Sequence, residues 1–434
     1  MKYTLIVLLF FSYPSLSSSL LGGEITCRNI NGLMYETTLT IYRDTLAGNI
    51  PSSYTITYRD SLDTIIATHI VVTPPSVLWY NGFKSYNYID TINFPYAGTF
   101  KASAWSCCRD SVDNIPNSTS AGMYLECMIM ADGINSSPKF LNVPITLAQL
   151  DNPFTNNITP YDADRDSMSW ELTIPEDLVN NGSGGINIIS LPYNYPPADS
   201  SLPFHIDSLL GDILFKPNLL GKYQIAVKLL EWRNGLQIGY VKRDMELSVV
   251  PIVNTPITIQ ATIAVLTNNL TSWQQVWNSS MPHPDIYLSP GEDLFIQFAM
   301  SDPDLSGYPY SQCYSESILN SNASISSIGY SDWAECDYNW MSILPSYISN
   351  QPYFVTFRTF ERFYSPYYDK ILSDYTFRIF VSQNTTYLNE VVNMSNSVYL
   401  KSVDLLGREK DPNLPGFRID IYSDGKTKKI FKLD

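Results

Sequence analysis

The sequence predicts an all-β protein made of tandem antiparallel β-sandwiches, and three observations lead to this fold class. Tyr is abundant at 31 residues while charged residues make up only 16% of the 434-residue chain, a balance that suits half-buried strands and polar loops. Apolar and polar residues alternate over short runs that end at Gly, Asn or Pro. No long stretch shows the helical period. At about 100–150 residues per domain, the length predicts three or four domains.

The first 19 residues predict a secretory signal peptide. Lys2 precedes an apolar run at 5–11, and small residues follow at Ser15, Ser17 and Ser19, near the expected cleavage point. No later stretch reaches the roughly 18 uninterrupted apolar residues that a spanning helix needs. We therefore expect export, with no transmembrane segment left after signal cleavage.

Residues 20–142 predict a first sandwich that contains disulfides. Its clearest strand signals are four runs rich in Thr, Tyr, Ile and Val. These runs are Met34–Asp44, Ser53–Asp60, Thr64–Val72 and Met123–Met130.

Six cysteines in an exported chain predict three disulfides. A bridge between the neighbours Cys107 and Cys108 would close a strained ring, so we expect one of them to pair with Cys27 and the other with Cys127. Cys313 and Cys336 stand apart from these four and are expected to pair with each other. Zinc is excluded as an explanation because the paired Cys-x-x-Cys or His spacing of a zinc site is missing.

An internal repeat divides the rest of the chain. Residues 152–164 overlay without gaps on 292–304, and 222–232 overlay on 352–362. In each copy an Asp, Asp244 or Asp374, opens the last strand 21 residues after the Tyr that leads the preceding strand. Because the order and the spacing are both kept, we predict two copies of one sandwich, at 143–252 and 253–385. Residues 386–434 form a separate C-terminal segment.

An acidic motif, "YDADRD", lies near the start of the first copy. Asp162, Asp164 and Asp166 alternate along the chain, so in an extended strand they would share one face and repel one another unless a cation or a turn intervened. The overlay repeats the first two acids at Asp302 and Asp304. Calcium prefers oxygen ligands, and we expect weak calcium ligation among these five residues, at Asp162 and Asp164 first.

The motif also allows three interpretations other than the calcium pair: a capping turn, an EF-hand loop and a pair of catalytic acids. A turn in which Asp caps backbone N–H groups is the alternative, favoured for Asp166 and Asp302. An EF-hand is excluded because Ser167 and Thr173 stand where that loop needs Gly and Glu. Recurrence at a fixed place in a repeat disfavours a catalytic pair.

The segment "PFHIDSLLGDI" at 203–213 follows "DADRD" and precedes "YQIAVKLLEW". In this order the three segments resemble a cadherin-type repeat, which implies a cadherin-like or Ig-like sandwich. The resemblance implies that Asp162 and Asp164 contribute to a calcium site between consecutive domains. The chain departs from that pattern at "KPNLLGKY" and at the linker "VVPIVNTP", which lacks the acidic ligands of the family.

A wider resemblance covers the whole chain. The segments "GGEITCRNINGLMYETTLTIYRD", "SCCRDSVDNIPN" and "EWRNGLQIGYVKRDMELSVV" resemble parts of large surface proteins of gliding bacteria that use the type IX secretion system. Residues 398–434 resemble the sorting domain of type IX cargo, with a hairpin whose tight turn is Asp424-Gly425. The resemblance implies that the C-terminus engages the type IX machinery and that the protein reaches the outer cell surface.

The charge and the missing motifs narrow the function. A net charge of -15 argues against nucleic acid as a partner. None of His69, His205 and His283 has the spacing of a zinc site or of a catalytic Ser motif. The chain is therefore expected to be no enzyme but a secreted structural or adhesive surface protein, whose aromatic residues could bind a surface glycan or a protein partner. The alternative is a secreted glycan-binding or polysaccharide-degrading factor.

Overall fold

The computed structural model confirms the all-β fold class. The short helical turns are η2 (Ser118–Ser120), α1 (Glu316–Asn320) and η3 (Pro345–Tyr347). Among the residues described, no helix is long and apolar enough to cross a membrane. The predicted signal peptide and the turn Asp424-Gly425 lie outside the described residues, which are 20–45, 51–79, 83–144, 146–180, 186–251, 257–267, 270–278, 284–303, 307–320, 323–329, 332–364, 367–383, 399–403, 416–422 and 427–432.

The strands of residues 20–142, which we call the first unit, form a sandwich whose two halves face one another. The predicted strands Met34–Asp44 and Ser53–Asp60 are present with these bounds. One half has the strand order β1-β2-β6-β5 and the other has β4-β3-β7-β8. The strands are β1 (Leu20–Asn31), β2 (Met34–Asp44), β3 (Ser53–Asp60), β4 (Ile65–Val72), β5 (Val77–Leu78), β6 (Phe83–Asn93), β7 (Gly98–Ser106) and β8 (Met123–Ala131).

One long strand joins the first unit to the second unit, residues 143–252. β19 (Leu236–Val250) has 15 residues and so extends about 50 Å. One of its edges pairs with β18 (Gly221–Arg233), while the other is shared in turn by β8, β1 and β10 (Thr146–Gln149). The boundary expected after residue 142 therefore does not separate two sheets, because the two units share a 12-stranded sheet.

The second and third units have the same strand pairings, as the internal repeat predicts. In the second unit β10 runs parallel to β19, β18 follows, and β13 pairs with β18. In the third unit, residues 253–385, β22 runs parallel to β28, β27 follows, and β24 pairs with β27. The strands new to this comparison are β13 (Ser167–Thr173), β22 (Asp285–Leu288), β24 (Gly307–Ser315), β27 (Tyr353–Tyr364) and β28 (Tyr367–Val381).

A second sheet completes each of these two sandwiches. It has the order β11-β17-β16 in the second unit and β21-β20-β23-β26-β25 in the third. Two short ladders, β9 with β12 and β14 with β15, flank the second unit. These strands are β9 (Lys139–Phe140), β11 (Phe154–Asn157), β12 (Pro160–Tyr161), β14 (Glu176–Asn180), β15 (Ile186–Ser190), β16 (His205–Ile206), β17 (Asp212–Phe215), β20 (Thr258–Thr267), β21 (Leu270–Asn278), β23 (Glu292–Ser301), β25 (Ala323–Gly329) and β26 (Trp333–Trp340).

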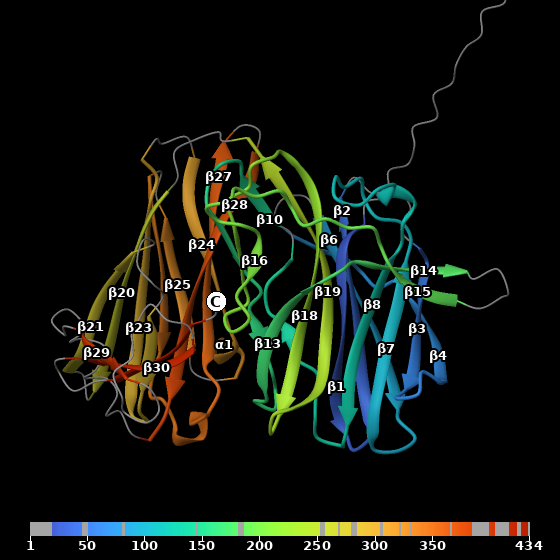
Figure 1. The fold of residues 1–434 in the computed structure, drawn as a ribbon, viewed down its shortest axis with the longest axis horizontal. Coiled ribbons are helices and arrows are strands. Elements are labelled where there is room, and N and C mark those ends of the chain that lie inside the picture. The colour runs from blue at the N-terminus through green and yellow to red at the C-terminus, as the bar shows by residue number, and fades with distance from the viewer. Residues whose placement is uncertain are drawn as a thin grey trace, which may run out of the picture.

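The three units lie side by side, with their strands running across the long axis of the molecule (Figure 1). One hydrophobic core runs through the first and second units and includes Phe354 of the third. A second core fills the third unit. Lateral packing rather than end-to-end contact therefore joins the sandwiches.

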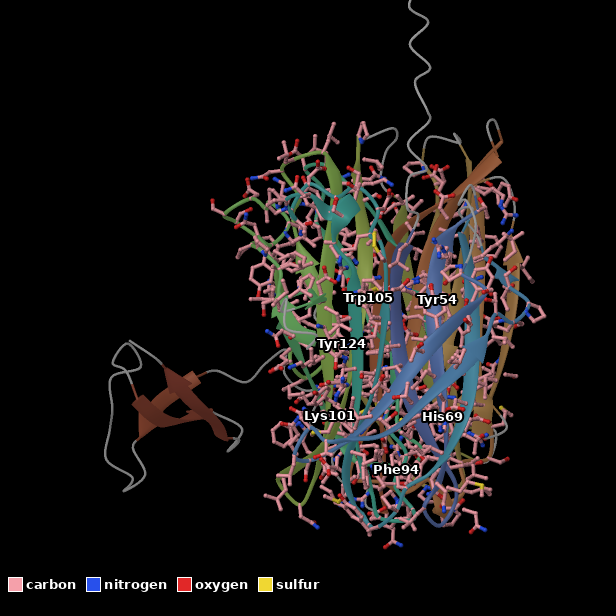
Figure 2. All side chains as sticks on the ribbon, turned by 90° about the vertical axis from the view of Figure 1, so that its right-hand side faces the viewer. Tyr54, His69, Phe94, Lys101, Trp105 and Tyr124 are labelled. Carbon is pink, nitrogen blue, oxygen red and sulfur yellow. A yellow bond between two sulfur atoms is a disulfide. The ribbon has the colours of Figure 1, made fainter. Side chains whose placement is uncertain are left out.

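The C-terminal segment forms a sheet of its own. The predicted hairpin is present as β30 (Gly416–Tyr422) and β31 (Thr427–Lys432), and β29 (Tyr399–Val403) adds a third strand on the other side of β30. Figure 2 shows this small sheet apart from the sandwiches.

The cysteines differ from the predicted pairing. Cys107 and Cys108 are bonded to each other, so the bridges expected from them to Cys27 and Cys127 are absent. The reason is position: both follow the end of β7, whereas Cys27 and Cys127 point into the core from the middle of β1 and β8. The bridge expected between Cys313 and Cys336 is absent as well. Both are free thiols, with Cys336 in the core of the third unit and Cys313 packed against it.

Candidate functional site

The acidic motif folds into a tight loop between β12 and β13. One carboxylate oxygen of Asp162, Oδ1, accepts hydrogen bonds from the backbone N–H groups of Asp164 at 3.0 Å and Asp166 at 2.9 Å. Arg165 takes a left-handed conformation with φ 62°, which directs the chain back toward β13. The predicted Asp-rich turn is thus present, but Asp162 caps it rather than Asp166, for which this role was favoured, because the Asp166 carboxylate is held by Arg233.

The three acids of the motif have different surroundings. Asp166 is buried and accepts two hydrogen bonds from the Arg233 guanidinium, at 2.9 and 2.5 Å. Asp164 is exposed and accepts a hydrogen bond from the backbone of Ser136, in the first unit, at 2.6 Å. Asp162 is only 1% exposed, and its Oδ2 has no hydrogen-bond partner among the described residues.

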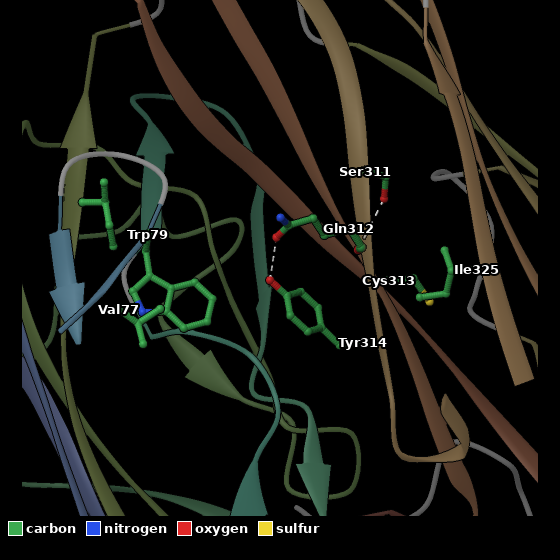
Figure 3. A pocket seen from close by; sticks show the side chains of 8 residues that line it. Val77, Trp79, Ser311, Gln312, Cys313, Tyr314 and Ile325 are labelled. Carbon is green, nitrogen blue, oxygen red and sulfur yellow. Dashed lines mark hydrogen bonds between the residues drawn. The ribbon is translucent and has the colours of Figure 1, made fainter. Parts of the chain in front are cut away.

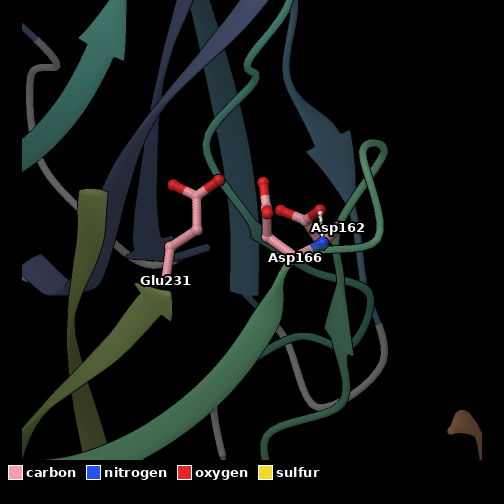
Figure 4. Close-up of side chains that lie close together, drawn as sticks. All are labelled: Asp162, Asp166 and Glu231. Carbon is pink, nitrogen blue, oxygen red and sulfur yellow. Dashed lines mark hydrogen bonds between the residues drawn. The ribbon is translucent and has the colours of Figure 1, made fainter. Parts of the chain in front are cut away.

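A fourth acid, Glu231 of β18, completes a buried cluster with Asp162 and Asp166 (Figure 4). Ligand atoms of the three side chains lie within 4.8 Å of one another. Glu231 is 0% exposed, and neither of its carboxylate oxygens accepts a hydrogen bond from the part of the chain described. Gly239 faces Glu231 across the β18–β19 ladder, where a Cβ would overlap Oε2, so the missing side chain provides the room for this carboxylate.

The electrostatics of the cluster favour protonated acids when no cation is present. Burial raises the pKa of Asp162 to about 7, and the charges of Asp164 and Asp166 add to the increase. Burial, with the charges of Asp162 and Asp166, raises the pKa of Glu231 to about 9. The cluster thus contains two carboxyl groups that ionise near or above neutral pH.

The carboxylate oxygens of the cluster supply part of the coordination shell that a hard cation needs. Calcium takes six to eight oxygens, and Asp162 Oδ2 and both oxygens of Glu231 are available, while Asp166 is shared with Arg233. A cavity of about 120 Å³ borders Asp162 between the second and third units, enough for several waters or an ion with waters. Neither Asp166 nor Glu231 lines this cavity, so among the described residues the cluster offers three unpartnered carboxylate oxygens, fewer than calcium prefers.

The structure separates the five residues expected to bind calcium. It brings Asp162 and Asp166 together and places Asp164 at the rim, outside the cluster. In the third unit Asp302 is buried at the end of β23, and Asp304 lies outside the described residues. Glu231 was not expected from the sequence as a member of this cluster, although the repeat overlay pairs it with Glu361, which is also fully buried.

The two aspartates expected to open the last strand of each repeat lie instead in the middle of a longer strand, Asp244 in β19 and Asp374 in β28, and they hold the junctions between units. Asp244 of β19 forms a buried ion pair at 2.6 Å with Arg109 of the first unit. In β28, Asp374 pairs with Arg358 at 2.8 Å and also accepts hydrogen bonds from Asn156 and the backbone of Asn157, both in the second unit. Equivalent positions thus join each repeat to the unit before it.

Arg165 extends the junction between the second and third units. Its guanidinium forms an ion pair with Glu316, donates a hydrogen bond to the carbonyl of Gln351 at 2.6 Å, and lies 3.8 Å from the ring centre of Tyr353. The same acidic loop therefore provides both the cluster and a contact to the third unit.

A separate groove of about 700 Å³ lies between the first and third units (Figure 3). Trp79 lines one side, with its ring stacked on Phe83 and its Nε1 donating to Ser85 at 2.7 Å. Tyr314, the residue after Cys313, lines the other side, and its hydroxyl donates a hydrogen bond to Gln312 at 2.7 Å. The groove presents mainly apolar and aromatic surface.

Comparisons with known proteins identify no family. No family model matches the sequence, and no curated protein matches it. Among solved structures, a chain of the complex of Dpr2 Ig1-Ig2 with DIP-Theta Ig1-Ig3 shares 8% identity over 83% of this chain and 100% of that chain, with a TM-score of 0.15. The titin I-band fragment I67-I69 shares 10% over 83% of this chain and 99% of that chain (TM-score 0.16), and eight Ig domains of Down Syndrome Cell Adhesion Molecule share 7% over 95% and 82% (TM-score 0.17). Scores this low carry no argument, so the fold class rests on the strand pairings of this chain.

Proposed function

We propose that the protein is a non-enzymatic structural or adhesive component of an outer cell surface. The observation that carries this proposal is the pair of junctions centred on Asp244 and Asp374, which join three sandwiches into a single laterally packed block. Buried ion pairs at both junctions favour one fixed arrangement of the units. Such a block exposes loops at both ends of its strands, where a partner surface could bind.

The C-terminal sheet supplies the proposed route to the surface. A three-stranded sheet outside the sandwiches fits a sorting segment that the type IX machinery recognises. Deletion of residues 386–434 should leave the sandwiches folded but abolish surface display, measured by antibody labelling of intact cells. Undiminished labelling of the deletion strain would contradict a sorting role.

We further propose that calcium binds the cluster of Asp162, Asp166 and Glu231 and stiffens the junction beside it. The unpartnered oxygens of Asp162 and Glu231 support this. Calorimetry at pH 8 should detect calcium binding in the wild type and in Asp164→Asn, whose carboxylate is outside the cluster, but not in Asp162→Asn. Loss of binding in both Asp162→Asn and Asp164→Asn would instead favour the pair Asp162 and Asp164 expected from sequence.

Adhesion itself can be tested in cells. A strain that lacks the gene should attach less to surfaces or to other cells, and the wild-type gene should restore attachment. Equal attachment of the deletion strain and the wild type would count against an adhesive role.

A glycan-binding function is the second candidate, and the groove with Trp79 and Tyr314 on opposite sides favours it, since aromatic rings stack on sugars. If the groove binds glycan, Trp79→Ala should reduce binding of the purified chain to a glycan array. An unchanged array profile would remove this groove from consideration.

A further inference from the structure

A second groove, on the outer face of the first unit, has the lining of a small-molecule site. Its volume is about 490 Å³, within the range of about 300–1,000 Å³ common for ligand pockets. It lies over β3 and β7, and Leu178 of β14 forms part of its wall. Figure 2 views this face, with Trp105 and Tyr54 labelled at the same level.

Trp105 is the largest exposed side chain in this groove, and its ring is held in place. The residue is 40% exposed, while its Nε1 donates a hydrogen bond at 2.8 Å to Asp177, which is buried. A Cβ at Gly122 would overlap both Trp105 and Asp177, so this glycine provides the space for the pair. An aromatic ring fixed before a ligand arrives loses little entropy on binding.

Short hydroxyl side chains lie beside the ring. Ser53, Thr55 and Thr57 alternate along β3 and so share the outer face of the sheet. Ser103 of β7 accepts a hydrogen bond from Arg59 at 2.8 Å, which fixes its hydroxyl. Cys107, bonded to Cys108, adds polarisable sulfur at the end of β7. None of the described residues that line the groove is charged.

We propose that this groove binds a neutral saccharide. The apolar face of a sugar ring would stack on Trp105, and its hydroxyl groups would exchange hydrogen bonds with Thr55 and Thr57. An anionic ligand fits poorly, because the lining offers no cation and the chain carries a net charge of -15. Asp177 is a positioning residue that orients the indole. The inference rests on the proposed adhesive function and names a class of ligand for it.

The test uses the full mature chain on an array of neutral and acidic oligosaccharides, followed by calorimetry with the best neutral ligand. Trp105→Ala should weaken binding about ten-fold or more, the equivalent of losing one good stacking contact. Thr55→Val, which removes only a hydroxyl, should weaken it about two- to ten-fold. Tyr96→Ala is the control, since Tyr96 is an exposed aromatic residue of the first unit that lines neither groove, and it should bind as the wild type does.

Variants of Asp177 test whether this residue affects binding by orienting the Trp105 indole or only by supporting the fold. Asp177→Ala should weaken binding, whereas Asp177→Asn should largely restore it, because the amide oxygen still accepts from the indole N–H. The inference is wrong if no neutral glycan binds, if only acidic glycans bind, or if Trp105→Ala binds normally. A chain that supports cell attachment yet binds no neutral glycan would overturn this inference and leave the adhesive function standing.

Discussion

At the scale of single residues, Glu231 is the side chain that most needs an explanation. A carboxyl group without a hydrogen-bond partner in a fully buried position costs stability unless it is protonated or binds a cation. Its pKa of about 9, against an ordinary 4.5, means that the folded chain holds this proton at neutral pH. The charge of the cluster therefore depends on pH.

Glu231→Gln should change stability in opposite directions with and without calcium. In a chelator at pH 8 we expect the variant to be more stable than the wild type by more than about 1 kcal/mol, because a neutral amide replaces a carboxyl whose burial costs free energy when it ionises. In excess calcium the order should reverse, since the variant loses a ligand. Urea denaturation under both conditions measures the two differences. The same order in both would rule out a cation at Glu231.

The motif residues show how far the sequence could predict this site. The alternating acids of "YDADRD" were visible and a turn was expected there, but its cap is Asp162 and not Asp166 as favoured. The exposure of Asp164 and the burial of Asp166 could not be predicted, because both depend on neighbours far along the chain, Ser136 and Arg233. Glu231 sits among apolar residues of a strand, and only its pairing with Glu361 in the repeat indicated a special role.

At the scale of elements, the last hairpin of each repeat unit organises the molecule. β19 and β28 each carry a buried Asp that faces the preceding unit, and each is paired along its length with the strand before it. The hairpin is therefore both part of a core and the junction to the next sandwich.

Removal of the junction carboxylate in β28 should be costly. Asp374→Ala leaves Arg358, which is 0% exposed, without its ionic partner, and it removes the acceptor for Asn156 and Asn157. Breaking a buried ion pair typically costs about 3–5 kcal/mol, and we expect a loss of that order in the free energy of unfolding. Asp63→Asn is the control, because Asp63 pairs with Lys101 at the surface, a pair that should contribute about 0–1 kcal/mol, and Asn tolerates the left-handed backbone of this position. Similar losses for the two variants would refute a junction role for Asp374.

The contact between β1 and β19 depends on a small residue. A Cβ at Gly22 would overlap the backbone carbonyl of Asp244, so Gly22→Ala should force the two strands apart. Faster amide hydrogen exchange in β19 near residues 243–245 is the expected readout. Gly329→Ala should have little effect, because a Cβ there meets only ordinary contacts at 3.6 Å or more. Unchanged exchange in Gly22→Ala would mean that the strands tolerate the added methyl group.

Strand periodicity explains what was predictable at this scale. Alternation gave β2 and β3 with their final bounds, and the repeat spacing anticipated the matching pairings of the second and third units. It could not reveal that β19 divides one edge among β8, β1 and β10, since alternation indicates which face of a strand is buried but not which strand pairs with it. For the same reason the alternation could not show that strands on both sides of the domain boundary predicted after residue 142 share one sheet.

At the scale of the whole molecule, lateral packing places many carboxyl groups between layers. Burial raises the pKa of Asp162, Asp212, Glu246 and Glu316 to about 7 and that of Glu231 to about 9. Asp162 and Glu316 lie beside the contact of the second and third units, and Glu246 lies in β19. An ordinary end-to-end chain of sandwiches would leave most such groups in solvent.

These shifts predict that the protein loses stability as the pH rises through neutrality. The folded pKa of each group lies above its ordinary value of 3.8 or 4.5, so its contribution is fully present below about pH 4 and is lost as the pH rises toward 7 to 9. Two of the described carboxyl groups oppose the trend: hydrogen bonds and Arg233 lower the pKa of Asp132 despite partial burial, and hydrogen bonds from Ser201 lower the pKa of Asp199. In a chelator the free energy of unfolding should therefore be larger at pH 5 than at pH 8, as measured by urea denaturation across this range. Calcium should reduce the difference by stabilising the ionised cluster, and a chain most stable at pH 8 without cations would show that these carboxyl groups are ionised and paired in the fold.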